Sequence, residues 1–231
     1  MRFSETDLIV SQDKIYHLDI SPEHLAEVIL TVGDPDRVAL ISRHFQKIEH
    51  TQSNRGFVFH TGYYKGRRIS VLSTGMGTHN IDIVLTELDA VANIDLKKRK
   101  VKEPLTRLKI IRLGTTGALQ EHIALDSIIV SEQAIDLTGM MLFYHQSMTQ
   151  EQTNFIAALT QHMEGYLPKI PLRLFPADSN LVQLFHGNIP CIKGITITCP
   201  GFYAAQDRNL RAARAYPDFL PQLASFNYKN Q

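Results

Sequence analysis

Cysteine is scarce and tryptophan is absent from this chain of 231 residues, whose only cysteines are Cys191 and Cys199. Two cysteines cannot build a multiple-disulfide framework, and these two do not form a Cys-x-x-Cys pair. No apolar run approaches the roughly 20 residues that a transmembrane helix needs. Residues 1–10 carry two acidic side chains and lack the apolar stretch of a signal peptide. We therefore expect a soluble protein of the reducing cytoplasm.

An excess of charge of either sign is also missing. The chain has 24 basic and 23 acidic side chains, which gives a formal net charge of +1. A general nucleic-acid binder carries a clear basic excess, so we expect neither a nucleic-acid nor a membrane partner. The basic stretch 97–102 falls between a predicted helix and a predicted strand, and we interpret it as a solvated loop.

Several well-known site motifs are missing as well. The chain has no P-loop sequence Gly-x-x-x-x-Gly-Lys-Ser/Thr, and Gly75-Met76-Gly77 does not continue into the dinucleotide fingerprint Gly-x-Gly-x-x-Gly. It also has no Gly-x-Ser-x-Gly elbow and no His-Glu-x-x-His or other closely spaced metal set. Nucleoside triphosphates, NAD and a metal site are therefore disfavoured.

Short apolar runs typical of strands alternate with segments of helical spacing. Residues 28–32 stop at Gly-Asp-Pro, and residues 56–64 and 67–73 predict a hairpin that turns at Lys65-Gly66. Strands separated by helices predict an α/β fold, a three-layer α/β/α arrangement whose central sheet the hairpin makes mixed. No composition shift marks a boundary, so we predict a single domain over residues 1–231. Further strands are predicted at 108–113, 127–135 and 192–198, and helices at 36–45, 79–94 and 149–164.

Three glycine-containing segments follow predicted strands, at residues 33–37, 73–78 and 112–118. In open α/β sheets, ligands bind outside the carboxyl ends of strands, which is where these segments fall. Arginine matches a phosphate group bidentately, and glycine and threonine loops add N–H and hydroxyl donors. Arg37, Arg55 and Arg112 are the candidates. Together the segments predict one pocket for a phosphate and a small polar ligand.

Taken singly, two of the three segments have plain structural interpretations. Gly33-Asp34-Pro35 is typical of a tight turn that starts a helix, although Arg37 would lie in the first turn, where N–H groups and the helix dipole favour an anion. Gly75-Met76-Gly77 alone is weak support for a site. Arg112 is more informative, because an arginine at the end of an apolar strand should be buried unless it meets an anion.

In combination the segments resemble the nucleoside phosphorylase family, and within it the uridine phosphorylases. The resemblance covers nearly the whole chain and is carried by five segments in the family's order. They are Tyr16-His17-Leu18, Val32-Gly33-Asp34-Pro35-Asp36-Arg37-Val38, Arg55-Gly56-Phe57, Ser73-Thr74-Gly75-Met76-Gly77 and Arg112-Leu113-Gly114-Thr115-Thr116-Gly117-Ala118.

The resemblance implies a role for each matching residue. His17 would come from a partner subunit and hydrogen-bond the 5′-hydroxyl of a ribose, and Thr115 would lie near the sugar. Arg55 would also reach across a dimer interface, and Arg112 and Thr115 would act in catalysis. The phosphate ligands would be Gly33, Arg37, Arg55, Arg112 and Thr115.

Residues 202–208 resemble the base-recognition segment of uridine phosphorylases. Phe202 would stack on the base, while Gln206 and Arg208 would bind its carbonyls and ring N–H. Uracil displays an acceptor, a donor and an acceptor along one edge, which an amide and a guanidinium can satisfy. Without the resemblance, Phe202 would be interpreted as a core aromatic and the other two as surface residues.

The implied activity is the reversible phosphorolysis of uridine to uracil and ribose 1-phosphate, a pentosyltransferase reaction of nucleoside metabolism and pyrimidine salvage. Inorganic phosphate would be the co-substrate, with no metal and no organic cofactor. Sites that borrow residues from a neighbour require at least a homodimer, and the resemblance implies a hexamer.

Two departures from the family pattern leave alternatives open. Family members continue beyond this point with a strand whose glutamate holds the ribose hydroxyls, so we expect the domain to be incomplete at its C-terminus. Pro200-Gly201 differs from the best-known bacterial enzymes before the base segment. The alternatives are a purine nucleoside phosphorylase and a non-catalytic module that binds a nucleoside or phosphate.

Overall fold

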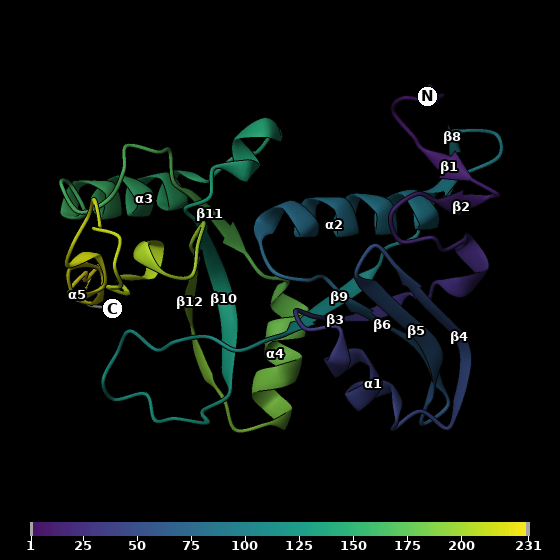
Figure 1. The fold of residues 1–231 in the computed structure, drawn as a ribbon. Coiled ribbons are helices and arrows are strands. Elements are labelled where there is room, and N and C mark those ends of the chain that lie inside the picture. The colour runs from purple at the N-terminus through teal and green to yellow at the C-terminus, as the bar shows by residue number, and fades with distance from the viewer. Residues whose placement is uncertain (1, 230–231) are drawn as a thin grey trace. The chain divides into compact units, whose positions relative to one another are not determined.

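The structure is a computed structural model that describes residues 2–229, so residues 1, 230 and 231 lie outside the described part. The chain divides into two units, residues 1–115 and residues 116–231, and Figure 1 shows the elements of both. Each unit is described by itself. The single domain expected over residues 1–231 stays a prediction.

The first unit contains a five-stranded sheet with the order β4-β5-β6-β3-β9. Strand β3 pairs in parallel with both β6 and β9, while β4-β5 and β5-β6 are antiparallel pairs. The sheet is therefore mixed, which confirms the prediction from the hairpin. The strand bounds are β3 (Val28–Val32), β4 (Lys47–Asn54), β5 (Phe57–Tyr64), β6 (Arg67–Ser73) and β9 (Lys109–Leu113).

Both hairpins of this sheet turn through two residues, Arg55-Gly56 and Lys65-Gly66. Backbone φ is positive at both central positions of each turn, at 51° and 84° in the first and 48° and 74° in the second. Such turns match the twist of the flanking strands and favour glycine. The turn at Lys65-Gly66 was predicted, whereas strand β4 was missed because its sequence is mostly polar.

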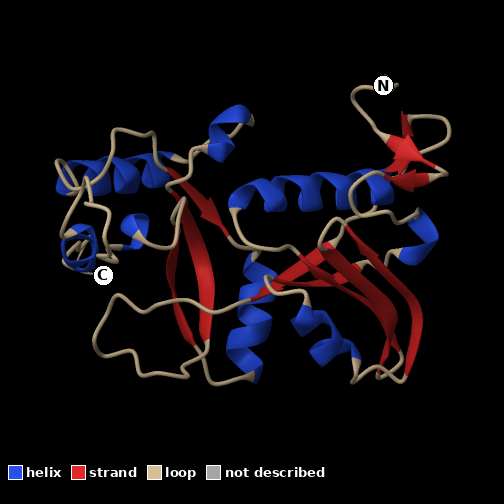
Figure 2. Cartoon of the chain, viewed as in Figure 1, coloured by secondary structure: helices blue, strands red, loops and turns tan. Residues whose placement is uncertain are grey.

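Helices cover both faces of the five-stranded sheet, as Figure 2 shows. On one face, α2 (Thr78–Asn93) packs its buried stripe against strand residues in a core cluster that includes Phe59 and Leu72. On the other face, α1 (Asp36–Ser42) packs through Val38 against Val32 and Val71. Each large side chain buried in this way contributes about 1.5–3 kcal/mol. The three-layer arrangement is therefore present in the first unit.

The second unit contains a three-stranded sheet with the order β11-β10-β12. The central strand β10 (Ile129–Asp136) is parallel to β12 (Ile192–Thr198) and antiparallel to β11 (Arg173–Pro176). Helices α3 (Gln150–His162) and α5 (Phe219–Ala224) pack with this sheet in a second core cluster.

Helix α3 begins after a capping box in which Thr149 accepts the N–H of Gln152, so the predicted start at residue 149 was right. Helix α4 (Ser179–Asn188) was not predicted. None of its side chains is buried, although Leu181, Val182 and Phe185 do recur at helical spacing in the sequence.

The remaining elements are short. The N-terminal segment forms β1 (Val10–Ser11), β2 (Lys14–Ile15) and the 3₁₀ turn η1 (Pro22–His24). The basic stretch 97–102 lies in a small hairpin of β7 (Ile94–Asp95) and β8 (Lys100–Val101), so it is an ordered turn rather than a plain loop. In the second unit, 3₁₀ turns occur at η2 (Met140–Phe143) and η3 (Ala204–Gln206).

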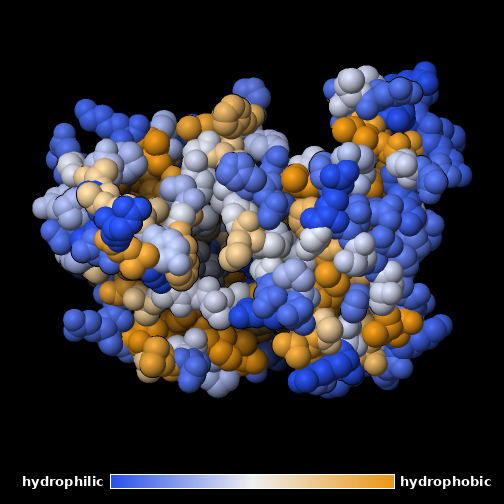
Figure 3. All heavy atoms as spheres, in the orientation of Figure 1, coloured by the Kyte–Doolittle hydropathy of each residue, from blue (hydrophilic) through white to orange (hydrophobic). Residues whose placement is uncertain are grey.

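The surface carries dispersed hydrophobic side chains. On the face shown in Figure 3, orange hydrophobic groups are small and separated by hydrophilic ones. Single exposed apolar residues such as Met76, Leu125 and Phe143 are ordinary for a folded domain. No helix in residues 2–229 is long and apolar enough to cross a membrane.

Candidate functional site

The carboxyl ends of β6, β3 and β9 lie side by side at one edge of the five-stranded sheet. Val32, the last residue of β3, pairs with Ser73 on one side and with Leu113 on the other. The next residue after β6, Thr74, donates its N–H to the carbonyl of Val32 at 2.7 Å. The three glycine segments therefore begin at the same edge, as the sequence predicted.

Arg112 and the two glycine loops are in direct proximity at this edge. A Cβ placed on Gly33 would lie 3.7 Å from the carbonyl oxygen of Gly75 and 3.8 Å from Nη2 of Arg112. Nη1 of Arg112 donates to Oγ1 of the buried Thr74 at 3.3 Å. Within residues 2–229, no carboxylate forms an ion pair with this guanidinium. The edge thus presents an uncompensated cation beside exposed loop backbone, which suits an anion.

Arg112 is exposed to solvent, although the sequence argument expected an arginine at this position to be buried or to meet an anion. It belongs to β9, the last strand in the order of this sheet, and the end of such a strand opens to water. Burial therefore does not single out Arg112. The convergence of Gly33, Thr74 and Gly75 around its guanidinium does.

Two N–H groups at the start of α1 are already hydrogen-bonded to Asp34 in the loop after β3. Oδ1 of Asp34 accepts the N–H of Asp36 at 3.0 Å, and the carbonyl of Asp34 accepts the N–H of Arg37 at 3.1 Å. These two N–H groups are therefore not free for an anion, contrary to the expectation for this helix start. The side chain of Arg37, which is half-buried, is still a candidate donor to an anion. Thr115 lies in the exposed loop two residues beyond the end of β9.

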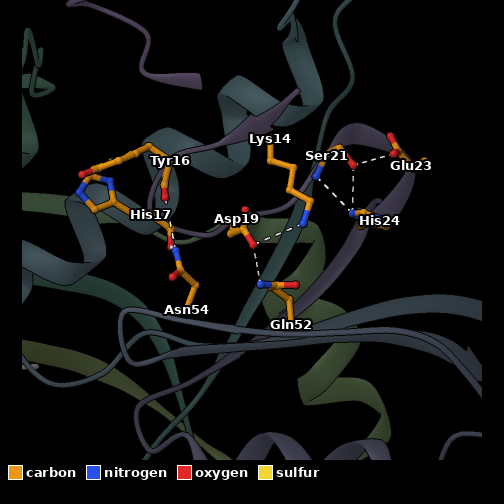
Figure 4. Close-up of polar contacts among 9 residues, drawn as sticks. All are labelled: Lys14, Tyr16, His17, Asp19, Ser21, Glu23, His24, Gln52 and Asn54. Carbon is orange, nitrogen blue, oxygen red and sulfur yellow. Dashed lines mark hydrogen bonds and ion pairs between the residues drawn. The ribbon is translucent and has the colours of Figure 1, made fainter. Parts of the chain in front are cut away.

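His17 and Arg55 form a second group with Tyr16. Arg55 is at the tip of the β4–β5 hairpin, where its Nη2 donates to the Tyr16 hydroxyl at 2.7 Å and its Cζ lies 4.5 Å from the centre of that ring. The rings of Tyr16 and His17 meet edge to face with centroids 4.9 Å apart. Figure 4 shows Asn54 below the main chain of Tyr16 and His17. Its amide donates to the carbonyl of His17 at 2.9 Å.

Helix α2 separates the two groups. Near its start, the amide of Asn80 donates to the carbonyl of Met76 in the loop after β6. Two turns later, Glu87 accepts hydrogen bonds from His17. Seven residues of α-helix span about 10 Å. The first unit thus brings Gly33 and Arg112 together in one group, the Arg112 group, and His17 and Arg55 together in another, the His17–Arg55 group.

The three base-recognition candidates come together in the second unit. The Cζ of Arg208 lies 3.9 Å from the centre of the Phe202 ring, and Nη1 donates at 2.6 Å to Oε1 of Gln206. Nε2 of Gln206 donates to the carbonyl of Gly201 at 3.1 Å. Phe202 is 59% exposed and is therefore not the core aromatic of the alternative interpretation.

Asp207 anchors this segment and was missed in the sequence. Its carboxylate forms an ion pair with Arg214 and accepts the N–H of Leu220 at 3.1 Å, at the start of α5. The backbone of Asp207 is left-handed, with φ of 58°. Asparagine and aspartate tolerate that conformation best among residues with a side chain, but the ion pair itself leaves no signal in the sequence. Within residues 2–229, no group of three His, Cys, Asp or Glu side chains is arranged to hold a metal ion.

The chain has relatives among known proteins. A sequence model of the phosphorylase superfamily matches residues 27–220, and the chain belongs to this family. The matched stretch includes the Arg112 group and the Phe202–Arg208 segment. The α/β class that was predicted is confirmed by this match and by the solved structures below.

The curated relatives include both uridine and purine nucleoside phosphorylases. A uridine phosphorylase from Thermococcus kodakarensis is 30% identical over 193 residues, which are 84% of this chain and 58% of the relative. A DeoD-type purine nucleoside phosphorylase from Alkaliphilus metalliredigens is 38% identical over 119 residues, 51% of this chain and 46% of the relative. The chain thus spans about half the length of these curated relatives.

Solved structures agree with the fold. A Trypanosoma brucei nucleoside phosphorylase, described as showing uridine phosphorylase activity, is 26% identical with a TM-score of 0.84. That comparison covers 95% of this chain and 78% of the other. A uridine phosphorylase from Vibrio fischeri is 24% identical with a TM-score of 0.56, over 84% of this chain and 67% of the other, and shows the shared fold.

Proposed function

We propose that the protein catalyses the reversible phosphorolysis of uridine. A phosphate oxygen forms a bond to C1′ of the ribose while the bond from C1′ to N1 of the base breaks, and the bonding electron pair leaves with uracil. N1 of the leaving base takes up the proton that the hydrogen phosphate gives up, so the products are ribose 1-phosphate and uracil. The observation that carries the proposal is the convergence of Gly33, Gly75 and Arg112 at one sheet edge in a member of the phosphorylase superfamily.

Phosphate is both the nucleophile and the main electrostatic stabiliser in this proposal. The glycosidic bond breaks through a state with oxocarbenium character, so positive charge grows on the sugar. A phosphate fixed beneath C1′ meets that charge and is already positioned for attack. Its ligands are Gly33, Arg37, Arg112 and Thr115, with Arg55 from a neighbouring subunit. The step balances without a metal or an organic cofactor.

The base site follows from the contact between Arg208 and Gln206. The guanidinium donates to Oε1 of Gln206, and when these side chains turn to a base they can supply a donor–acceptor–donor row of guanidinium N–H, amide oxygen and amide N–H₂. The edge of uracil is acceptor–donor–acceptor, so the two rows are complementary. Negative charge that moves onto the leaving uracil is received by Arg208. Phe202, whose ring is exposed, would stack on the base after the Arg208 guanidinium moves from that ring to the edge of the base.

In this proposal the ribose site depends on the assembly of subunits, because a neighbouring chain supplies His17. His17 binds the 5′-hydroxyl and Thr115 lies near the sugar. His17 and Arg55 form their own group about two turns of α2 away from the Arg112 group, which supports their action in a neighbour's site. The active unit is then a homodimer with sites built from both chains, and a hexamer is three such dimers.

A second candidate is purine nucleoside phosphorolysis. It is favoured by the DeoD-type relatives, among them one that is 38% identical over 119 residues. The edge of hypoxanthine offers a carbonyl and an N–H but then a C–H, so it satisfies only part of the donor–acceptor–donor row. A non-catalytic nucleoside-binding module is the third candidate.

Competition between nucleosides distinguishes the three. Base release from uridine and from inosine is measured on the 231-residue chain at saturating phosphate, and binding of each nucleoside is measured by calorimetry. The proposal expects uracil release at a much higher kcat/KM than hypoxanthine release. A preference for inosine supports the purine candidate, and binding without release supports the module.

A further inference from the structure

Glu87 is a buried carboxyl group whose contacts are devoted to one short segment. It lies in the middle of α2 and is 9% exposed. Its oxygens accept the main-chain N–H of His17 at 3.1 Å and that of Leu18 at 2.9 Å. Oε1 also lies 2.6 Å from Nδ1 of the His17 ring. Within residues 2–229, no lysine or arginine forms an ion pair with it.

These contacts decide where His17 carries its proton. Both oxygens of Glu87 already accept main-chain N–H groups, so the group acts as an acceptor throughout, as an ionised carboxylate does. The hydrogen between Oε1 and Nδ1 therefore belongs to Nδ1. A neutral imidazole with its proton on Nδ1 has a lone pair on Nε2, and that nitrogen can only accept.

The main chain of His17 is held as firmly as its ring. Glu87 of α2 accepts its N–H, and the amide of Asn54 in β4 donates to its carbonyl at 2.9 Å. Figure 4 shows the contact with Asn54. Tyr16, the preceding residue, is covered by Arg55. Backbone and ring orientation are therefore both fixed before a ligand arrives, so Nε2 is a preorganised acceptor.

We propose that Glu87 is a positioning residue that fixes the Nδ1–H tautomer of His17, and thereby selects nucleosides with a free 5′-hydroxyl. A hydroxyl can donate to the Nε2 lone pair, whereas a 5′-deoxy group offers no donor and a 5′-phosphate offers acceptors that meet an acceptor. The inference rests on the proposed role of His17 at the ribose. What the inference adds to that role is Glu87, which makes a hydrogen-bond donor at the 5′-position a requirement for binding.

The tautomer is tested without any substrate. Long-range ¹⁵N–¹H NMR correlations of the imidazoles are recorded at a pH well above the titration range of an ordinary histidine, with His17 assigned by its loss in H17Q. The expected result is a protonated Nδ1 and an unprotonated Nε2. A proton on Nε2, in the other tautomer or in an imidazolium, would overturn the proposal.

The specificity is tested by binding, so that a chain without turnover still gives an answer. Dissociation constants for uridine and 5′-deoxyuridine are measured for the wild type, for E87Q and for D89N. In E87Q the amide N–H₂ faces Nδ1 and reverses the tautomer, so the affinity for uridine should fall about 10-fold while that for 5′-deoxyuridine stays within about 2-fold. Asp89 is exposed on the same helix, and D89N removes the same charge without touching His17.

Equal losses for both nucleosides in E87Q would assign Glu87 a merely structural role and overturn the proposal. So would equal affinity of the wild type for the two nucleosides. If uridine binds as expected but no base is released, the proposed phosphorolysis fails while the role of Glu87 stands.

Discussion

Arg112 is the cation around which the loops at the sheet edge gather, and its removal is the sharpest test of a single residue. We expect R112A to lower kcat/KM for phosphate by about 10²-fold or more, because one preorganised donor to a developing charge is worth that much. Unfolding should change little, since the side chain is exposed. The measurement is phosphate saturation at fixed uridine.

The matched control is R67A. Arg67 is exposed at the amino end of β6, the opposite end of the strand from Thr74. The R67A variant should show the same KM for phosphate as the wild type. Normal phosphate saturation of R112A would remove Arg112 from the anion site.

Individual site residues could be predicted where a local sequence pattern marks them, but not where their role depends on contacts with distant parts of the chain. Gly33 and Arg112 stood in recognisable strand ends, and both lie at the predicted edge. Glu87 reads as an ordinary helical glutamate, and its partner His17 is 70 residues away in the chain. Arg112 was expected to be buried unless it meets an anion, but its exposure depends on the order of the strands, which local sequence does not reveal.

At the scale of elements, the β4–β5 hairpin carries Arg55 and depends on the close approach of two strands at Gly62. A Cβ on Gly62 would lie 2.3 Å from the carbonyl oxygen of Lys47 and 2.6 Å from the Phe45 ring. Because one of these atoms is backbone, the strands must separate. We expect G62A to lower the free energy of unfolding by about 1–3 kcal/mol or more, measured by urea denaturation.

The comparison variant is G194A, in the interior of β12. A Cβ there meets nothing within 4 Å, and replacing a strand glycine with alanine is neutral or stabilises by up to about 1 kcal/mol. If G62A and G194A unfold alike, the close approach at Gly62 does not constrain the hairpin.

The contact between η1 and β4 predicts the pH dependence of stability. The rings of His24 and His50 stack with centroids 3.6 Å apart, and the buried Nε2 of His50 has no hydrogen-bond partner among residues 2–229. Burial lowers the pKa of both imidazoles below the ordinary 6.5. Nearby positive charge lowers both pKa values further: Lys14 acts on both rings, Arg68 on His24, and His24 on His50. The carboxylates of Glu23 and Asp19 raise both pKa values but do not outweigh burial.

The sign follows from which state binds more protons. Below about pH 6.5 these two histidines bind protons in the unfolded chain but not in the folded one. The free energy of unfolding therefore falls as the pH decreases through that value. Thermal midpoints measured between about pH 7.5 and 5.5 should therefore decline, and less so in H50F, which keeps a ring in the stack. The exposed His44 gives the control H44F. A slope that H50F leaves unchanged would exclude this pair as the cause.

The fold at this scale was largely predictable. Strand β3, the hairpin of β5 and β6, and the start of α3 followed from apolar runs, glycine turns and a capping box. Strand β4 was missed because a polar edge strand carries little periodic signal. In α4 the helical spacing of Leu181, Val182 and Phe185 was present in the sequence but was not recognised.

At the scale of the whole molecule, sites shared between subunits predict that two inactive variants restore each other. R112A damages a subunit's own site, and R55A damages its neighbour's. After subunit exchange, half of the dimers are mixed and each holds one intact site of two, so about a quarter of wild-type activity should return. The measurement is uracil release by the mixture against that of each variant alone. Activity no greater than the sum of the two would place Arg55 in its own chain's site.

The central claim is that bond cleavage uses phosphate as the nucleophile, and product stoichiometry tests it most directly. Uridine is incubated with the 231-residue chain, with and without inorganic phosphate, and uracil and ribose 1-phosphate are quantified together. The account predicts equal amounts of the two products, formed only when phosphate is present. Uracil released without phosphate, accompanied by free ribose, would contradict it.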